Sequence, residues 1–124
     1  MTRPALFAAV VLCLALTATA ARAMTVREFL AVADRLPQNA SAVLRPEGRR
    51  LVNEVSEAVH RIRAEQAEAL RDGRRPAHCI PARGTGITPR GLLARFRALP
   101  AERRDLSVTE ALRQWMAERH PCGA

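Results

Sequence analysis

Four stretches of the chain place apolar residues about every three to four positions, the spacing of a helix with one buried face. They predict a first helix over 26–36, a long second helix over 46–72, and two shorter helices over 89–99 and 108–120. No stretch alternates apolar and polar residues over the roughly four to eight positions that mark a strand. The sequence therefore predicts a small all-α domain of four helices, one of them long.

The expected core consists of apolar residues that share one face of each predicted helix. In chain order these are Val26, Phe29, Leu30, Ala33 and Leu36; Leu51, Val55, Ala58, Val59, Ile62, Ala69 and Leu70; Leu92, Leu93, Phe96 and Leu99; and Val108, Ala111, Leu112, Trp115 and Met116. Arginine and glutamate occupy most of the other face of the long helix, which we expect to be solvated.

Polar residues mark the beginnings of two helices, and a glycine marks one end. Thr25 with Glu28, and Ser107 with Glu110, have the spacing of a capping box. In this motif each side chain accepts a hydrogen bond from a free backbone N–H of the other residue. Gly73 is the expected stop of the long helix, because glycine adopts the left-handed conformation that ends many helices.

The first 23 residues have the layout of a secretory signal peptide. Arg3 gives a positive start, residues 5–16 are almost all apolar, and Ala23 completes a small-x-small cleavage site. We expect cleavage after Ala23 and a mature domain over 24–124. A retained membrane anchor is the alternative, but the apolar run is shorter than the ~20 residues that span a bilayer. The sequence thus predicts a periplasmic protein without a stable membrane anchor after cleavage.

Cleavage would remove Cys13 and leave Cys79 and Cys122 as the only thiols of the mature chain. Two thiols exported to an oxidising compartment form a disulfide that persists there. We therefore expect a single Cys79–Cys122 disulfide. It would close a loop of about 44 residues, for which the chain-entropy model gives roughly 4 kcal/mol of stabilisation.

Two other chemistries could use the same cysteines. His78 and His120 lie beside them, so four side chains could bind zinc, but structural zinc sites usually have roughly two to four residues between paired ligands. Cys79 could instead be a nucleophile with His60, His78 or His120 as its base, which requires a free thiol. The disulfide is favoured over both, and we expect no metal, no cofactor and no catalytic residue.

The charge of the chain bears on its partners. All 20 basic residues are arginine, and without Arg3 and Arg22 the net charge falls from +8 to +6. This sign favours acidic partners or membrane surfaces. Predicted export argues against nucleic acid. So do Phe29, Phe96 and Trp115, because they lie on apolar helical stripes and do not alternate with arginine as base-stacking platforms would.

The segment 81–90 is rich in glycine and proline and predicts a loop. It is tied at one end by the expected disulfide and at the other by the helix start at Thr88 and Pro89. We predict that Arg83, Thr85 and Arg90 contact a protein partner, because anchored loops on helical scaffolds commonly carry function. The alternative is a flexible, solvated connector with two surface arginines.

Several of these features, taken in order, resemble the Rap/Tai immunity proteins of type VI secretion. They are the signal peptide, the opening Met-Thr-Val-Arg-Glu-Phe-Leu at 24–30, a long charged helix, Cys-Ile-Pro at 79–81, Gly-Ile-Thr at 86–88, Glu-Ala-Leu at 110–112 and a final Pro-Cys at 121–122. The resemblance covers most of the mature chain. It implies a small periplasmic helical protein, often a homodimer, that binds a peptidoglycan amidase and blocks its active site. It also implies a disulfide between the two cysteines and a scaffold role for the helices over 87–115.

A weaker similarity leads to a different function. The Phe-Leu-Ala-Val opening at 29–32 looks like that of the HdeA/HdeB periplasmic acid-stress chaperones, which are also small, helical and held by one disulfide. Such proteins disorder in acid and expose apolar surface. A basic chain gains self-repulsion as its 12 carboxylates become protonated, which suits acid unfolding. A non-inhibitory envelope protein is the third alternative, and none of the three is an enzyme.

Overall fold

The computed structural model describes residues 22–123, so nearly all of the predicted signal peptide lies outside the described residues. The described chain is all-helical, and its elements in order are α1 (Val26–Ala33), the 3-10 helix η1 (Ala40–Leu44), α2 (Pro46–Arg71), α3 (Pro89–Ala98), the 3-10 helix η2 (Ala101–Arg103) and α4 (Val108–Arg119). Within this range there is no strand, only an isolated antiparallel bridge between Thr25 and Ser107. The predicted class of four α-helices, one of them long, is confirmed.

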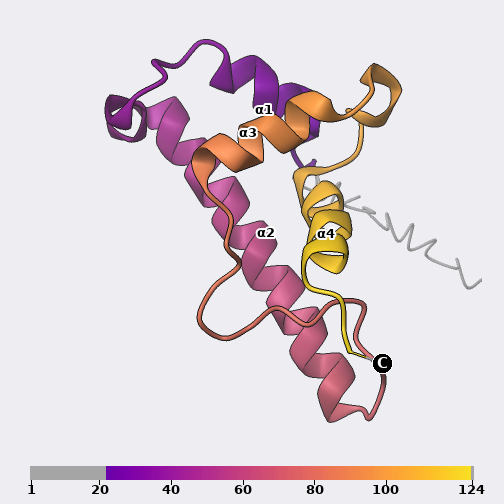
Figure 1. Cartoon of the computed structure of the whole chain (residues 1–124). Coiled ribbons are helices and arrows are strands. Elements are labelled where there is room, and N and C mark those ends of the chain that lie inside the picture. Colours follow the sequence, from indigo (N-terminus) through magenta and orange to yellow (C-terminus); the bar gives the residue numbers. More distant parts are fainter. Residues whose placement is uncertain (1–21, 124) are drawn as a thin grey trace, which may run out of the picture.

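The long helix α2 is the spine of the molecule. Its 26 residues make a rod of about 39 Å at 1.5 Å per residue. Helices α1 and α4 both pack on α2, and α3 lies against α1 (Figure 1). After α2 the chain turns back as a long loop that runs beside the second half of α2 before it enters α3 (Figure 1). None of the helices in the described range has the length and apolar composition needed to cross a membrane.

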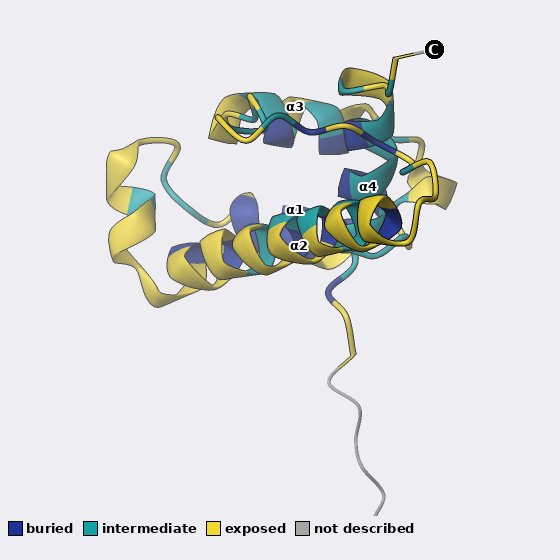
Figure 2. Ribbon diagram, turned by 90° about the horizontal axis from the view of Figure 1, so that it is seen from below, coloured by how far each residue is buried: buried dark blue, intermediate teal, exposed yellow. Residues whose placement is uncertain are grey.

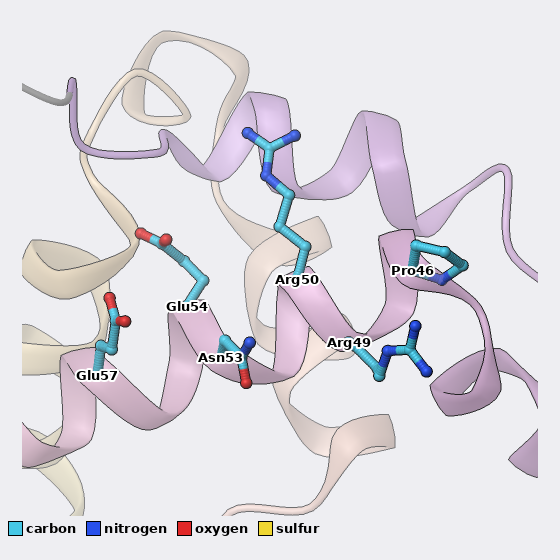
Figure 3. A pocket seen from close by; sticks show the side chains of 6 residues that line it. All are labelled: Pro46, Arg49, Arg50, Asn53, Glu54 and Glu57. Atoms are coloured by element: carbon cyan, nitrogen blue, oxygen red, sulfur yellow. The ribbon is translucent and has the colours of Figure 1, made fainter.

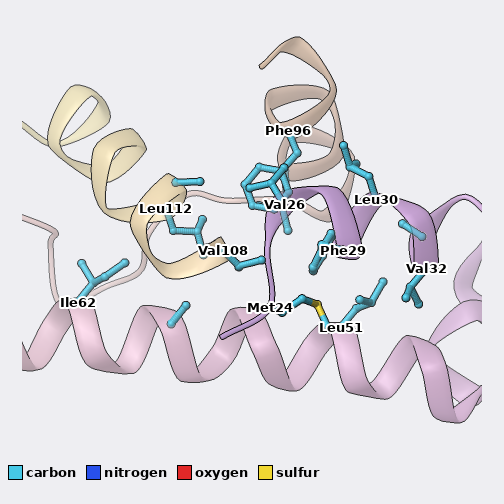
Figure 4. Close-up of a cluster of buried hydrophobic side chains, with 14 of the residues drawn as sticks. Met24, Val26, Phe29, Leu30, Val32, Leu51, Ile62, Phe96, Val108 and Leu112 are labelled. Carbon is cyan, nitrogen blue, oxygen red and sulfur yellow. The ribbon is translucent and has the colours of Figure 1, made fainter. Parts of the chain in front are cut away.

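The core lies where α1, α2, α3 and α4 meet (Figure 4). Its fully buried apolar side chains include Val26, Ile62, Phe96, Val108, Leu112 and Met116. Phe29 of α1 meets Phe96 of α3 edge to face, with ring centroids 5.3 Å apart. Edge-to-face aromatic pairs contribute about 0.5–1.5 kcal/mol beyond the area that they bury. The apolar stripes predicted from the sequence therefore converge on one core.

The beginnings of α1 and α4 are joined through their backbones. Val26 N–H donates to the carbonyl of Leu106, and Val108 N–H donates to the carbonyl of Met24, both at 2.9 Å. These two bonds form the bridge between Thr25 and Ser107 and bury the side chain of Met24. The first residues of the described domain are thus paired with a segment about eighty positions later, which fixes how α1 and α4 meet.

One predicted capping box is complete and the other is half formed. At α1, Thr25 Oγ1 accepts from Glu28 N–H and the Glu28 carboxylate accepts from Thr25 N–H. At α4, Ser107 Oγ accepts from Glu110 N–H, but the Glu110 carboxylate binds the Arg113 side chain. The Glu110 side chain is therefore used to hold Arg113, which matters for the site described below.

The first helix is shorter than predicted. It ends at Ala33, and Leu36, expected in the core, is only partly buried. Arg35 and Leu36 donate their N–H groups to carbonyls three residues back, so the chain tightens into a final turn before Pro37. Proline disfavours helical geometry at the residue before it, so Leu36 cannot extend the helix into another turn. Val32 is buried in α1 although the predicted core did not contain it.

The predicted burial of Leu70 is wrong, because its side chain is 60% exposed. Leu70 lies on the last turn of α2, on the flank of the helix that faces away from α4. Trp115, also predicted to face the core, is partly buried and packs against its edge. The guanidinium of Arg95 lies 5.8 Å from the Trp115 ring centroid, as in a cation–π contact. Figure 2 shows that α2 has buried residues on one side and mostly exposed or half-buried residues elsewhere.

Candidate functional site

The predicted disulfide is present and closes the molecule at the far end of α2. Cys79 and Cys122 are bonded, with their Cα atoms 5.0 Å apart. Beside the bond, Cys79 N–H donates to the His120 carbonyl at 2.8 Å, and Arg75 donates to the Cys122 carbonyl at 3.2 Å. The disulfide thus joins the loop after α2 to the end of the chain after α4.

Gln66 of α2 binds the same loop through its side-chain amide. Its Oε1 accepts from Ile80 N–H at 2.8 Å, and its Nε2 donates to the Ile80 carbonyl at 3.1 Å. The same Oε1 accepts from His78 Nδ1 at 3.0 Å. Because Oε1 is an acceptor only, the His78 proton lies on Nδ1. Arg63, one turn earlier on α2, donates to the Pro81 carbonyl at 3.2 Å. We call the disulfide with Gln66, His78 and Ile80 the clasp.

His78 is the one polar side chain buried in the described residues, with 1% of its surface exposed. Burial lowers the pKa of His78 below its ordinary value of 6.5, because the imidazolium would lose its hydration. Glu65 opposes this shift and Arg113 adds to it. The ring is therefore neutral near pH 7, which fits its role as a hydrogen-bond donor to Gln66.

An ion pair between α2 and α4 lies next to the clasp. Arg113 donates to both carboxylate oxygens of Glu65, at 2.8 and 2.9 Å, and also to Glu110. The hydrogen bond from Arg113 lowers the pKa of Glu65 from its ordinary value of 4.5. The same bond raises the pKa of Arg113. This fork-to-carboxylate geometry is the strongest form of a partly exposed ion pair and fixes the two helices side by side.

The predicted recognition loop, 81–90, is held in its middle as well as at its ends. His120 Nε2 donates to the Thr85 carbonyl at 2.7 Å, and the Arg119 guanidinium donates to the Thr85 and Gly86 carbonyls, both at 3.2 Å. Gly86 has a φ of +74°, and a Cβ added there would lie 2.7 Å from the Arg119 guanidinium. A side chain at position 86 would therefore displace Arg119.

The three predicted contact residues of this loop differ in their surroundings. Arg83 and Arg90 are exposed, and neither makes a hydrogen bond or ion pair within the described part of the chain. Thr85 is half-buried, and its Oγ1 accepts from Ile87 N–H at 3.2 Å. The two arginines are thus available to a partner, whereas the Thr85 hydroxyl stabilises the loop itself. The loop is also more constrained than the flexible connector that we weighed from its glycines.

The zinc and nucleophile alternatives both require free thiols, and the disulfide contains both sulfur atoms. His78 is bonded to Gln66, and His120 is bonded to the Thr85 carbonyl. His60 is exposed on the outer face of α2. Within residues 22–123 no three His, Cys, Asp or Glu side chains are grouped so that they could hold a metal ion.

A shallow hollow lies on the outer face of α2 (Figure 3). It is lined by Pro46, Arg49, Arg50, Asn53, Glu54 and Glu57. Two arginines and two glutamates give it no net formal charge. It is open to solvent and contains no nucleophile beside a base, so its chemistry does not point to catalysis.

Sequence reasoning missed the residues that hold the loop, namely Gln66, Arg63 and Arg119. Each lies on a helix surface where glutamine and arginine are ordinary, so no local pattern marks it. The one available signal is Gln66, which interrupts the apolar edge of the long helix between Ile62 and Ala69. No protein-family model, no curated protein and no solved structure matches the chain. The resemblance to the Rap/Tai proteins therefore stays a prediction.

Proposed function

We propose that this chain is a periplasmic immunity-type protein that binds and inhibits a peptidoglycan-degrading amidase effector. The observation that supports this most is the loop 81–90, which the clasp, Arg63, Arg119 and His120 hold in one conformation while Arg83 and Arg90 stay exposed. A loop that is already ordered loses little conformational entropy on binding. Pre-organised surfaces of this kind are typical of protein inhibitors of enzymes.

The charge of the loop suits an acidic site on the partner. A guanidinium binds a carboxylate through two parallel N–H donors, so Arg83 and Arg90 would each recognise an Asp or Glu near the mouth of the enzyme. Inhibition then needs only that the loop cover the catalytic cleft. In this proposal the chain contributes no catalytic group, cofactor or metal, and its partner is a protein.

The test is complex formation near neutral pH with purified peptidoglycan amidases of the secreted effector class. The exported, oxidised protein should elute with the enzyme in size-exclusion chromatography. Replacing both Arg83 and Arg90 by Ala should weaken the complex by about 1–3 kcal/mol, as for central interface residues. Their loss should change folding stability by no more than about 0.5 kcal/mol, as at other exposed sites.

The matched control is the double replacement Arg61→Ala and Arg71→Ala. These arginines are also exposed and also make no hydrogen bond or ion pair in the described range, but they lie on α2. The control should keep the affinity of the unchanged protein. Equal affinity of both double variants would move the binding surface away from the loop 81–90.

A second candidate function is an acid-stress chaperone, which the buried, neutral His78 favours. Acid protonates His78 in the unfolded chain before the folded one, and it removes the carboxylate that binds Arg113, so the clasp region would loosen. A chaperone should suppress aggregation of unrelated proteins near about pH 2–3 while it loses its own near-ultraviolet signal. If neither assay gives a signal, a non-inhibitory envelope protein is the function that remains.

A further inference from the structure

The acidic residues of α2 all lie on one flank of the helix. They are Glu47, Glu54, Glu57, Glu65 and Glu68. At 100° per residue they fall within an arc of roughly 80°. The flank on the other side of the buried stripe also covers roughly 80° and contains no carboxylate. Its residues are Gly48, Val52, Ser56, Val59, Arg63, Gln66 and Leu70. We call it the acid-free flank.

Two segments of the chain bound this flank along its length. At one end η1 packs against Gly48 so closely that a Cβ there would lie 1.9 Å from the Ala42 carbonyl oxygen. At the other end Arg63 and Gln66 hold the loop at Ile80 and Pro81. Gly48 and Arg63 are fifteen positions apart, which corresponds to about 22 Å of helix.

The bounded stretch and its η1 border expose aliphatic side chains. Val52 is 53% exposed, and on η1 Val43 is 51% and Leu44 75% exposed. Val59, two turns beyond Val52, is half-buried. Large apolar side chains that are grouped on a surface commonly mark a site of protein contact.

Arginines without partners lie at both borders. Arg45 and Arg49 are exposed beside η1, Arg83 is exposed on the loop at the other border, and Arg90 is exposed on the first turn of α3, directly after that loop. None of the four makes a hydrogen bond or ion pair through its side chain in the described residues. The stretch therefore has an aliphatic middle, arginines at both ends and no carboxylate of its own.

We propose that the acid-free flank between η1 and the loop 81–90 is a docking surface for a protein segment that presents aliphatic side chains together with carboxylates. This inference rests on the proposed function, which makes the partner a protein. It adds which surface binds that partner and what chemistry the partner must present. One helical segment, about 10 Å in diameter, can lie lengthwise along this stretch of about 22 Å. Its apolar side chains would cover Val52 and Val59, and its carboxylates would pair with the arginines.

The geometry favours a protein segment over a membrane or a second copy of the chain. The aliphatic side chains lie between two borders about 22 Å apart, a length that one helical segment can match. In a two-fold dimer each surface meets its own copy. The acid-free flank of one chain would then place its arginines against those of the other, which is repulsive.

The experiment uses a defined probe, so that it does not depend on the amidase. A synthetic helical peptide with leucine at helical spacing and glutamate elsewhere is titrated into the oxidised protein, and binding is followed by fluorescence anisotropy and by backbone amide shifts. The same peptide with lysine for glutamate is the charge control. We expect the glutamate peptide to bind and to shift amides around Val43, Val52 and Val59, and the lysine peptide not to bind.

Two matched pairs of variants locate the surface. Val52→Glu should weaken binding of the glutamate peptide about tenfold or more. Leu70→Glu, on the same flank but beyond the loop, should leave the affinity for the peptide within about twofold. Arg49→Glu should likewise weaken binding, and Arg50→Glu, at the neighbouring position on the acidic side, should not. Circular dichroism of each variant confirms that the exposed substitutions leave the fold intact.

Several outcomes of these experiments would contradict the proposed docking surface. Equal binding of both peptides, or amide shifts on the acidic flank, would overturn the proposal. So would binding of the protein to phosphatidylglycerol vesicles that Val52→Glu abolishes, or self-association through the same residues. Peptide binding without any amidase complex would support the docking surface and refute the proposed function. An amidase complex unaffected by Val52→Glu would support the proposed function and refute the docking surface.

Discussion

The two halves of α2 are held to the rest of the molecule by different forces. In the first half, Leu51 and Ala58 pack against the other helices, and the contacts are apolar and non-directional. In the second half Ile62 also enters the core, but Gln66 and Arg63 in addition bind a loop through hydrogen bonds, and a disulfide closes that loop. A domain of this size buries a limited core, so a covalent staple adds a large share of its stability.

This difference determines how each half responds to change. Apolar packing tolerates a change of shape better than a loss of volume, whereas a buried hydrogen-bond network depends on every member. The second half of α2 also positions the loop 81–90, through its bonds to the clasp. Both halves of α2 therefore contribute to the core, and the second half also presents the loop.

The largest effect is expected from the core. Phe96 is fully buried against Phe29, and Phe96→Ala removes that contact and leaves a cavity. We expect a loss of about 3–5 kcal/mol in the free energy of unfolding, measured by urea denaturation. A loss below about 1 kcal/mol would mean that α3 is not part of the core.

The clasp is tested next by removing its covalent bond. Replacing both Cys79 and Cys122 by Ser should cost about 2–4 kcal/mol, because the unfolded chain regains the freedom of the loop. Urea denaturation of the oxidised protein and of the double variant measures the difference. Thiol titration of the denatured, periplasm-derived protein should find no free cysteine. Two reactive thiols bound to stoichiometric zinc would contradict the disulfide as the native state.

A smaller effect is expected from Gln66→Ala, which leaves the buried His78 donor and the backbone groups of Ile80 without their partner. An unsatisfied buried donor costs about 1–3 kcal/mol. Gln114→Ala is the control, because its bonds join only the exposed Arg103 and the half-buried Glu110 and no buried group, and it should cost no more than about 0.5 kcal/mol. Equal unfolding midpoints of the two variants would show that Gln66 does not hold the loop.

The pH response should be smaller still and its sign follows from His78. Because burial lowers the pKa of His78 below 6.5, the unfolded chain binds this proton first as the pH falls. The stabilising contribution is therefore complete above pH 6.5 and decreases as the pH falls through the lowered pKa. The lowered pKa of Glu65 adds a second loss below 4.5. Urea midpoints at a series of pH values should show the first decrease in the unchanged protein and not in His78→Gln; parallel curves would assign it to another group.

The sequence predicted the regular part of this molecule well. The helix stripes, the Thr25 capping box and the disulfide follow from local spacing and from the expected compartment, and the structure contains all three. The exposure of Leu70 could not be predicted, because it depends on where neighbouring segments lie beyond the end of a helix. The bonds from Gln66 to the loop could not be predicted either, since they join positions that only the folded chain brings together.

The candidate site was predicted in part for the same reason. Loop anchoring at both ends can be inferred from the cysteine and the proline helix start, and the exposure of Arg83 and Arg90 agrees with that prediction. The hydrogen bonds from Arg119 and His120 to the middle of the loop required the three-dimensional arrangement of α4. Thr85 is less available to a partner than predicted, because its hydroxyl accepts from Ile87 N–H within the loop and its carbonyl accepts from His120 and Arg119.

The measurement that tests the central claim most directly is the hydrolysis of purified peptidoglycan by an amidase effector that binds this protein, near neutral pH, with increasing amounts of the oxidised protein. The account predicts that hydrolysis falls in proportion to the added protein and stops at a one-to-one ratio. The variant lacking both Arg83 and Arg90 should need a higher concentration for the same inhibition. Full hydrolysis at every ratio, with the protein folded and its disulfide intact, would contradict the proposed function.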